Sequence, residues 1–389
     1  MKNKSITIVI PVYNRPKLLN RLLQSLKKSN YLNDNIKLVI SMDKSNNPKI
    51  KKIVESFNWF QGDKIIINHN KHLGLREHII KCGNLTKKYN NIILLEDDLY
   101  VDRNFYTYSK QALKYYQGDS NIAGISLYSP GYNETLDLPF FALNGNYDGY
   151  FIQLPSSWGQ VWSKKQWEDF MKWYEKNQSI DFNGYTIPEN IKKWPETSWK
   201  KYFSAYMVDK NKYFLYPIKS CTTNFGEIGT HFKNKSVKFQ VPLLNNDIKN
   251  FRFVDLKESK SIYDIYYENI FLKDYLSKKG FSNLVVDLYG SKKIKSEYQY
   301  LLTSKKLNFK IIKSYGLKLK PPELNIFHDI KGEDIFLYNT NVKRDNKYLK
   351  KEDRYLTFYQ YFYSGLTIKK SIKFILKKII LSFKSAIFK

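Results

Sequence analysis

The amino-acid sequence predicts an α/β fold in which a mainly parallel sheet is flanked by helices. Two observations support this prediction. Short β-branched apolar runs alternate with segments whose apolar residues recur at helical spacing, which is typical of parallel sheets covered on both faces. The composition, with 42% apolar and 16% aromatic residues, is that of a protein with a sizeable core and excludes a disordered chain.

The first elements are a strand, a helix and a second strand. The run ITIVIPV over 6–12 is short, continuous and β-branched, which predicts a buried parallel strand. A second strand is expected over 36–41 and is followed by Asp43. The helix between them is predicted from apolar residues at helical spacing, namely Leu18, Leu19, Leu22, Leu23 and Leu26.

The same alternation continues along the chain. A helix is expected over 50–57, a strand over 64–68, a helix over 75–88 and a fourth strand over 91–95, with a further strand within 121–129. Ligands bind outside the carboxyl ends of the strands in such sheets. The residues that follow each strand are therefore the first candidates for a functional site.

Residues suited to ligand binding do follow these strands. Arg15 and Arg76 suit phosphates, because a guanidinium pairs with them in a fork geometry, and Asp43 suits a base or a ribose. Gly74 permits a close approach of the backbone. Structural roles stay open, with Arg15 as a surface arginine and Asp43 as a helix N-cap.

The triplet Glu96-Asp97-Asp98 ends the fourth predicted strand. Carboxylate oxygens are the ligands that hard divalent cations prefer, and the turn that leaves a strand lets adjacent side chains point in different directions. The triplet therefore predicts a site for a hard divalent cation. The alternative is an acidic turn that caps the next helix, with Asp102 as a surface acid.

Further along, the chain becomes rich in tryptophan. Rings at this density suit either a hydrophobic core or a wall that binds sugars. They are Trp158, Trp162, Trp167, Trp173, Trp194 and Trp199.

Three regions are expected. Residues 1–245 would form the catalytic domain, 246–340 a small α/β appendage, and 341–389 a basic C-terminal tail. Segments at 284–288, 294–302 and 309–312 suggest a β-α-β unit in the appendage. Residues 367–389 contain seven lysines and no acid, with Ile368, Ile372, Ile375, Ile379, Phe383 and Ile387 on one helical face. This pattern predicts an amphipathic helix that lies on an anionic membrane, or else packs with a solvated lysine face.

The formal net charge of +29 indicates anionic partners such as nucleic acid, anionic lipid or phosphorylated substrates. The two cysteines, Cys82 and Cys221, are too few for a disulfide scaffold and favour a reducing compartment. The sequence shows neither a signal peptide before 6–12 nor a run of ~18 uncharged apolar residues. We therefore expect a cytoplasmic protein, peripheral on the inner face of the cell membrane.

Several segments resemble known transferases. The opening TIVIPVYNRPKLLNRLLQSL is similar to the start of glycosyltransferase family 2, and LLEDDLYVDRNFYTY resembles the EDD segment of N-acetylglucosaminyltransferase I. The segments SSWGQVWSKKQWEDF and YPIKSCTTNFGEIGTHF resemble bacterial surface-polysaccharide transferases. The likeness covers roughly residues 5–235.

This resemblance implies a GT-A fold, a nucleotide-sugar donor that we expect to be a UDP-sugar, Mn²⁺ or Mg²⁺, and inversion at the anomeric carbon. The expected acceptor is a glycan or a lipid-diphosphate-linked sugar of a surface polysaccharide. Asp98 would hold the metal, helped by His231. The residues expected to bind the donor are Val12, Asn14, Arg15, Asp43, Gly74, Arg76, Glu96 and Asp97.

An inverting transfer needs a carboxylate that takes a proton from the acceptor hydroxyl. The resemblance points to Glu196 near the start of a helix, with Asp181 as the second choice. Where related enzymes often carry an acid directly after the tryptophan, this chain has Lys200. The other histidines, His69, His72 and His78, show no partner pattern and are expected to be local polar residues.

Two other classes of function remain open at this point. The charge and the tyrosines would suit a nucleic-acid-binding protein, although the sequence shows no helix-turn-helix, zinc-finger or RNA-recognition signature, and nucleic acid is not an expected partner. A nucleotidyltransferase would also place acids at strand ends. The residues PVYNR over 11–15 occupy the place where such an enzyme usually carries a Gly-rich phosphate loop.

Overall fold

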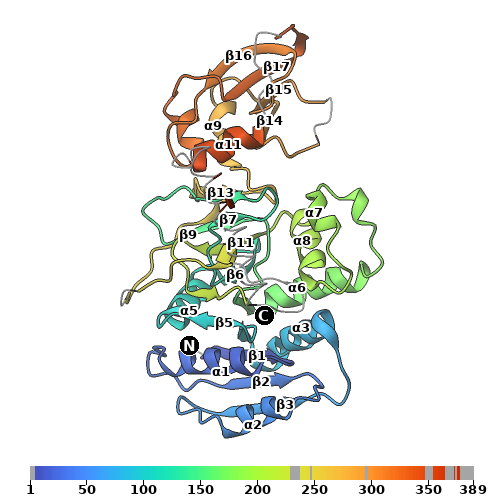
Figure 1. Cartoon of the computed structure of the whole chain (residues 1–389), viewed down its shortest axis with the longest axis vertical. Coiled ribbons are helices and arrows are strands. Elements are labelled where there is room, and N and C mark those ends of the chain that lie inside the picture. The colour runs from blue at the N-terminus through green and yellow to red at the C-terminus, as the bar shows by residue number, and fades with distance from the viewer. Residues whose placement is uncertain are drawn as a thin grey trace. The chain divides into compact units, whose positions relative to one another are not determined.

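The structure is a computed structural model that describes residues 5–227, 237–245, 248–293, 297–346 and 354–363, together with 372, 375 and 376. It divides into two compact units (Figure 1), one formed by Met1–Thr135 with Phe140–Phe271 and the other by Leu136–Pro139 with Leu272–Lys389. The sequence placed this boundary between 245 and 246. The first unit continues to Phe271 because the short strand β13 (Ile262–Tyr263) pairs with its central sheet.

A nine-stranded mixed sheet forms the centre of the first unit. In spatial order its strands are β13, β9 (Gly149–Ile152), β11 (Tyr213–Pro217), β6 (Ile122–Ser126), β10 (Gln160–Ser163), β4 (Asn91–Leu94), β1 (Thr7–Val12), β2 (Leu38–Met42) and β3 (Lys64–Asn68). Strands β3, β2, β1 and β4 are parallel neighbours, and β10 runs antiparallel between β4 and β6. The predicted α/β fold with a mainly parallel sheet is confirmed.

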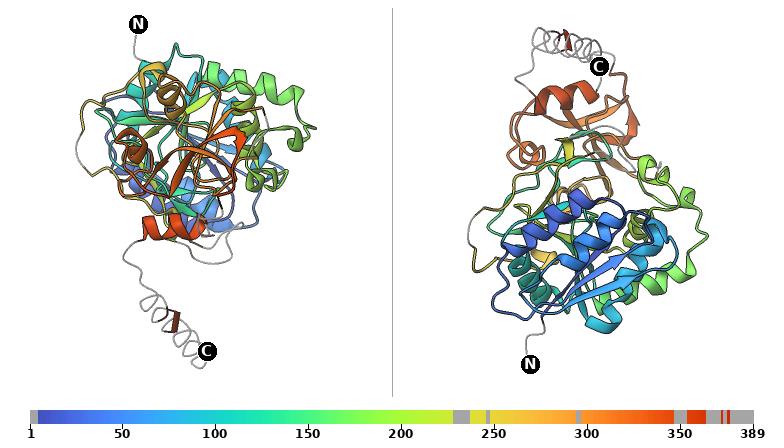
Figure 2. Two further views of the ribbon diagram at one scale, coloured as in Figure 1. Left: turned by 90° about the horizontal axis from the view of Figure 1, so that it is seen from above. Right: turned by 60° about the horizontal axis from the view of Figure 1, so that its bottom comes forward.

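Side chains of β1 alternate between two hydrophobic clusters, one on each face of the sheet. Ile8 and Ile10 belong to the cluster covered by α1 (Pro16–Lys27), α2 (Pro48–Ser56) and α5 (Phe105–Tyr116). Val9 belongs to the opposite cluster, which α3 (Gly74–Asn84), α6 (Lys164–Lys176) and α8 (Trp199–Asp209) cover. Figures 1 and 2 show α1 and α2 lying against the blue strands of the sheet. The alternating apolar strands therefore produce three layers.

Most of the tryptophans belong to the second cluster. Four of them, Trp162, Trp167, Trp173 and Trp199, are buried in it and serve as core packing. The remaining two of the predicted set, Trp158 and Trp194, are only partly buried.

Shorter elements complete the first unit. The predicted helix over 75–88 is divided into α3 and α4 (Thr86–Tyr89). Strand β5 (Leu99–Val101) follows the acidic triplet and pairs antiparallel with β12 (Thr222–Asn224). Helix α7 (Glu189–Lys192) lies between α6 and α8 in the sequence.

The second unit contains a four-stranded sheet of β14 (Leu284–Asp287), β15 (Tyr300–Thr303), β17 (Ile335–Lys343) and β16 (Phe309–Tyr315), in that order. Its helices are α9 (Phe271–Ser277), α10 (Glu323–Phe327) and α11 (Arg354–Phe362). Strands β14 and β15 are parallel, and β17 pairs antiparallel with both of its neighbours.

The predicted amphipathic helix over 367–389 lies outside the described residues, apart from 372, 375 and 376. In the part of the chain that the structure describes, none of the helices is long and apolar enough to cross a membrane.

Candidate functional site

A cavity of about 190 Å³ opens where the carboxyl ends of β1 and β4 lie side by side. The chain passes outward from β1 to β2 and β3 before it returns to β4 on the other side, which makes this the switch point of the sheet. The cavity is smaller than the ~300–1,000 Å³ typical of sites for drug-sized ligands, so a ligand as large as a nucleotide sugar would extend beyond it. The lining includes Val12, Arg15, Asp43, Gly74, Glu96 and Asp97.

Two carboxyl groups of the acidic triplet, those of Glu96 and Asp97, ionise with difficulty. Burial raises the pKa of Asp97 to about 7, against the lowering effect of Arg15. Burial also raises the pKa of Glu96, and the charge of Asp98 adds to that effect. The arrangement therefore favours a positively charged ligand, because a cation would stabilise the ionised carboxylates.

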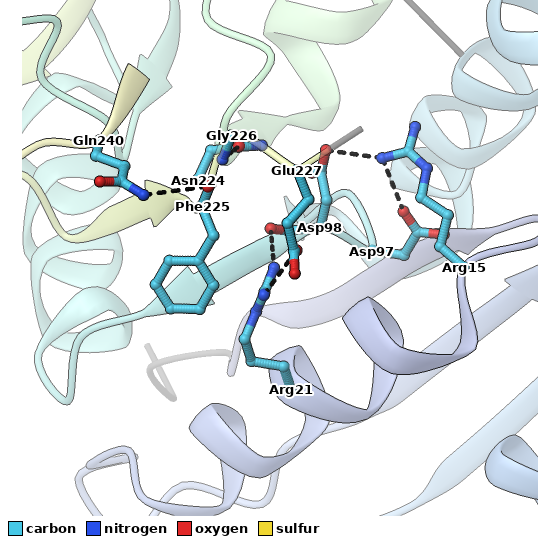
Figure 3. A network of polar contacts seen from close by, with 9 residues as sticks. All are labelled: Arg15, Arg21, Asp97, Asp98, Asn224, Phe225, Gly226, Glu227 and Gln240. Atoms are coloured by element: carbon cyan, nitrogen blue, oxygen red, sulfur yellow. Dashed lines mark hydrogen bonds and ion pairs between the residues drawn. The ribbon is translucent and has the colours of Figure 1, made fainter. Parts of the chain in front are cut away.

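Arg15 already supplies part of that positive charge. Its Nη1 lies 2.8 Å from Oδ2 of Asp98 and 3.6 Å from Oδ1 of Asp97 (Figure 3). The sequence predicted a phosphate partner for this guanidinium. In the structure the guanidinium instead connects the loop after β1 with the carboxylates that follow β4.

One carboxylate oxygen of Asp98 is suited to binding a metal ion. Its Oδ1 is buried and has no hydrogen-bond partner among the described residues. A hard divalent cation that accepts carboxylate and phosphate oxygens fits this atom. No group of three or more His, Cys, Asp or Glu side chains that could hold a metal ion occurs within the described ranges. Protein ligands would therefore be few, and phosphate oxygens of a bound nucleotide would have to complete the coordination.

A second arginine, which the sequence did not single out, holds the other side of the triplet. Arg21 on α1 donates from Nη2 to the carbonyl oxygen of Asp98 at 3.1 Å and from Nη1 to Oε2 of Glu227 at 2.7 Å. Its guanidinium carbon lies 3.8 Å from the ring centroid of Phe225. Figure 3 shows Arg21 between the triplet and the segment that leaves β12. Residue 231, the predicted histidine ligand, follows this segment and lies outside the described residues.

Asp43 is almost fully buried and holds the loop that begins α3. Its carboxylate accepts hydrogen bonds from the backbone N–H groups of Leu73 at 2.8 Å and Gly74 at 3.2 Å. Oδ2 also lies 2.9 Å from Nδ1 of His72. Gly74 has a φ of +73°, a conformation that strains other residues. Asp43 is thus not the N-cap residue that the sequence left open, since Asn47 caps α2 and Leu73 is the N-cap of α3. It lines the cavity and holds the backbone at the start of α3.

Two of the histidines expected to be local polar residues also reach the cavity, namely His72 and His78. The ring of His72 lies 4.7 Å from that of Tyr13, centroid to centroid. Nε2 of His78 lies 2.9 Å from Oγ of Ser41, and burial lowers the pKa of this imidazole to about 4. His72 lies in the loop before α3, so the rule of strand ends and nearby loops could have identified it, whereas His78 lies within α3 and that rule does not point to it.

The predicted base lies apart from the cavity lining. The side chain of Glu196 is 64% exposed. Oε1 accepts from Nζ of Lys201, Oε2 accepts from the hydroxyl of Tyr202, each at 2.5 Å, and these bonds lower its pKa. Arg76, expected to bind the donor, lies over the ring of Tyr202 at 5.0 Å from its centroid.

Two further predicted residues serve local contacts. Oδ1 of Asn14 accepts from Nδ2 of Asn47, the N-cap of α2, at 2.8 Å. Asp181, the second choice for the base, accepts from the backbone N–H of Asn183 at 2.9 Å and caps a short 3₁₀ helix.

A buried ion pair, which the sequence did not predict, lies near the triplet. Nζ of Lys200 donates to Oε1 of Glu134 at 2.8 Å. The same ammonium lies 4.9 Å from the ring centroid of Trp194 and 5.6 Å from that of Trp158. Its charge also acts on Glu96, whose pKa it lowers against the larger effect of burial.

A family model matches the first part of the chain. Residues 7–152 match the family Glycosyl transferase family 2, which is less than half of the chain. The match and the sheet order confirm the predicted glycosyltransferase domain and its GT-A type of α/β fold. A search of curated proteins finds no significant match to this chain.

Solved structures resemble the chain only distantly. S. aureus TarS 1–349 in complex with UDP-GlcNAc has a TM-score of 0.39 and 13% identity, covering 60% of this chain and 62% of that chain. GalNAc-T7 with UDP, GalNAc and Mn²⁺ has a TM-score of 0.39 and 15% identity, covering 56% and 43%. Mannosyltransferase PcManGT from Pyrobaculum calidifontis in complex with GDP-Man and Mn²⁺ has 0.30 and 11%, covering 43% and 46%. The chain thus spans about three fifths of the TarS chain. Likenesses this distant do not carry the chemistry of those proteins over to the present chain.

Proposed function

We propose that this chain transfers a sugar from a nucleoside-diphosphate sugar, with a UDP-sugar as the expected donor, in a reaction that requires Mn²⁺ or Mg²⁺ and inverts the anomeric carbon. The observation that carries the proposal is the acidic triplet at the switch point of the sheet, where Oδ1 of Asp98 is buried without a hydrogen-bond partner among the described residues. The family match over 7–152 supports the class of reaction.

The cavity residues and the neighbouring Asp98 have separate roles in this proposal. The divalent cation, held by Asp98 and the donor's phosphates, would neutralise the charge that develops on the leaving diphosphate. His72 lies on the loop that Asp43 holds, its ring lies near that of Tyr13, which follows β1, and we place the nucleobase of the donor beside these two rings. Arg15 would exchange its contact with Asp98 for the diphosphate, since a guanidinium binds phosphate in a fork geometry.

The proton of the acceptor hydroxyl needs a carboxylate. Glu196 is the candidate that the sequence suggests, with Asp181 as the second. The lowered pKa of Glu196 keeps it ionised at neutral pH. Its contacts with Lys201 and Tyr202 would have to loosen before it accepts a proton.

The resemblance of the EDD and aromatic segments extends the proposal to the acceptor. We propose a growing glycan or a lipid-diphosphate-linked sugar of a bacterial surface polysaccharide, met at the inner face of the cell membrane. The net charge of +29 supports an anionic surface or an anionic acceptor.

The test is a panel of nucleotide sugars with and without Mn²⁺. Thermal stabilisation and release of the nucleoside diphosphate are measured for each donor. One donor is expected to stabilise the protein only with the metal, and Asp98→Asn is expected to reduce turnover at least about 100-fold. Asp63→Asn, an exposed carboxylate paired with Lys37, is the matched control. Absence of binding and of hydrolysis with every donor would contradict the proposal.

A further inference from the structure

The loop that contains Trp158 lies at the strand end that carries the acidic triplet. In the antiparallel pair of β10 and β4, Gln160 lies opposite Leu94, where the pairing ends. The preceding residue, Gly159, stays close to the end of β4, because a Cβ atom there would lie 3.4 Å from Cδ2 of Leu95. The carbonyl oxygen of Trp158 accepts from Oγ1 of Thr222 at 2.6 Å, which fixes the loop at this edge.

The ion pair of Lys200 and Glu134 occupies the space next to this tryptophan. Lys200 is in the first turn of α8, and Glu134 follows β7 (Tyr132–Asn133). The Lys200 side chain is 11% exposed and that of Glu134 is 21% exposed. The indoles of Trp158 and Trp194 both lie within 5.6 Å of the ammonium. The pair and the two rings thus form one cluster at the triplet's edge of the sheet.

This cluster has the composition of a sugar-binding surface. Indoles suit the C–H groups of a sugar ring, and a carboxylate accepts hydrogen bonds from its hydroxyls. The ring of Trp158 also packs against Tyr128 and Phe239, at 4.7 and 4.8 Å between centroids. Lys200 fixes the position of that carboxylate, because its Nζ donates to Oε1 of Glu134 at 2.8 Å. Burying a charge is costly unless it is paired. The ion pair with Glu134 therefore explains how the ammonium of Lys200 is kept at this depth.

We propose that Glu134, held by Lys200 beside the indoles of Trp158 and Trp194, forms the acceptor side of the site and removes the proton from the acceptor hydroxyl. This inference rests on the proposed transferase function and gives the role of base to Glu134 in place of Glu196. Glu196 is mostly exposed and uses both oxygens on Lys201 and Tyr202. The side chain of Glu134 is less exposed, at 21%, and its Oε1 contacts Lys200 beside the two indoles.

The step balances in atoms and electrons. The acceptor oxygen forms a bond to the anomeric carbon while the bond from that carbon to the diphosphate oxygen breaks, and its electron pair leaves with the diphosphate. The proton of the acceptor hydroxyl passes to the carboxylate of Glu134. Attack from the side opposite the leaving group inverts the anomeric carbon.

Azide separates a base from a structural residue. It is an anion that attacks the anomeric carbon without losing a proton, so it needs no base. With the donor identified by the panel, Glu134→Ala is expected to lose hydrolysis at least about 100-fold, within the range that a general base contributes. Sodium azide is expected to restore turnover and to yield the glycosyl azide, with the KM for the donor changed less than about twofold. Glu168→Gln, a surface acid paired with Lys164, is the control.

The outcomes distinguish this inference from the function on which it rests. If wild-type protein binds no donor, the proposed function fails. If donor binding persists but Glu134→Ala keeps its hydrolysis, or if azide rescues Glu196→Ala and leaves Glu134→Ala inactive, only the assignment of Glu134 is overturned.

A second pair of variants distinguishes loss of the base from loss of the fold. Removing Glu134 alone leaves Lys200 buried without its partner, which can destabilise the fold. If Glu134→Ala does not fold, Glu134→Gln combined with Lys200→Gln removes both charges, and Lys200→Gln alone is its reference. At least about 100-fold lower hydrolysis in the double variant, relative to Lys200→Gln and at equal donor binding, is expected; equal hydrolysis overturns the assignment.

Discussion

At the scale of single residues, two arginines of one helix region hold the acidic triplet from opposite sides. Arg15 pairs with the carboxylates of Asp97 and Asp98, while Arg21 binds the carbonyl oxygen of Asp98. The side chain and the backbone of Asp98 are thus fixed independently. This geometry keeps the buried oxygen Oδ1 in place before any ligand arrives.

Arg21 is expected to contribute to stability through these contacts. Arg21→Met keeps most of the side-chain volume but removes the bonds to Glu227 and Asp98, and the free energy of unfolding is expected to fall by about 1–2 kcal/mol. Urea denaturation measures this difference. Arg252→Met is the control, because the Arg252 side chain is 68% exposed and its contact with Asp148 is long, at 3.9 Å from Nε to Oδ2. Equal effects of the two substitutions would count against a structural role of Arg21.

His78 is expected to make the protein less stable in acid. Burial lowers its pKa from 6.5 to about 4, so the folded state keeps the imidazole neutral while the unfolded chain takes up a proton. The free energy of unfolding should therefore decrease as the pH falls from 6.5 towards 4, by about 2 kcal/mol at pH 5. Urea denaturation at pH 7 and pH 5 tests this. In His78→Gln that part of the pH dependence is expected to disappear, and an unchanged dependence would contradict the assignment.

The sequence predicted several cavity residues because they follow strand ends. Arg15, Asp43, Glu96 and Asp97 all line the cavity for that reason, and Val12, expected from the family resemblance, lines it as the last residue of β1. Arg21 and Glu227 are 206 residues apart in the chain, and Glu134 and Lys200 are 66 apart. Nothing in the local pattern links such residues, because only the packing of helices on the sheet brings them together.

At the scale of elements, the close contact of α3 with α6 depends on a glycine. A Cβ atom at Gly83 would lie 2.1 Å from Cζ2 of Trp167. The indole is fully buried, and its Nε1 donates to Oδ1 of Asn84 at 2.9 Å. The ring therefore has little freedom to move away.

Gly83→Ala is accordingly expected to destabilise the protein, although alanine usually favours a helix over glycine by ~1 kcal/mol. The free energy of unfolding should fall by about 1–3 kcal/mol, as is typical of overpacked cores. Gly118→Ala is the matched control, because a Cβ atom there meets nothing within 4 Å. Urea denaturation compares the two variants. A stabilised Gly83→Ala variant would show that α3 and α6 can separate.

The parallel part of the sheet was predictable element by element, and the antiparallel part was not. Strands β1 to β4 are continuous β-branched runs separated by helical segments, so the local pattern determines them. Strand β10 is short and carries Trp162. A core tryptophan fits a helix as well as a strand, so the local sequence does not determine which element this segment forms. Its position between β4 and β6 is decided by pairing with strands far away in the chain.

At the scale of the whole molecule, the excess of basic residues is expected to bring the protein to anionic membranes. Replacing the seven lysines of 367–389 by glutamine should weaken binding to vesicles containing anionic lipid at least about tenfold, since each basic residue near such a surface contributes ~1 kcal/mol. Vesicle co-sedimentation measures binding, and neutral vesicles are the control. Donor hydrolysis in solution should be unchanged, and vesicle binding equal to that of the wild type would contradict a role for this segment.

The reversed direction of β10 has a consequence for how such a protein can diversify. Because this strand runs against its neighbours, the loop that enters it and carries Trp158 arrives at the same edge as the acidic triplet. Under the proposed function, a change in that loop alters the acceptor side of the site, while the carboxylates that follow β4 stay on a separate segment of the chain.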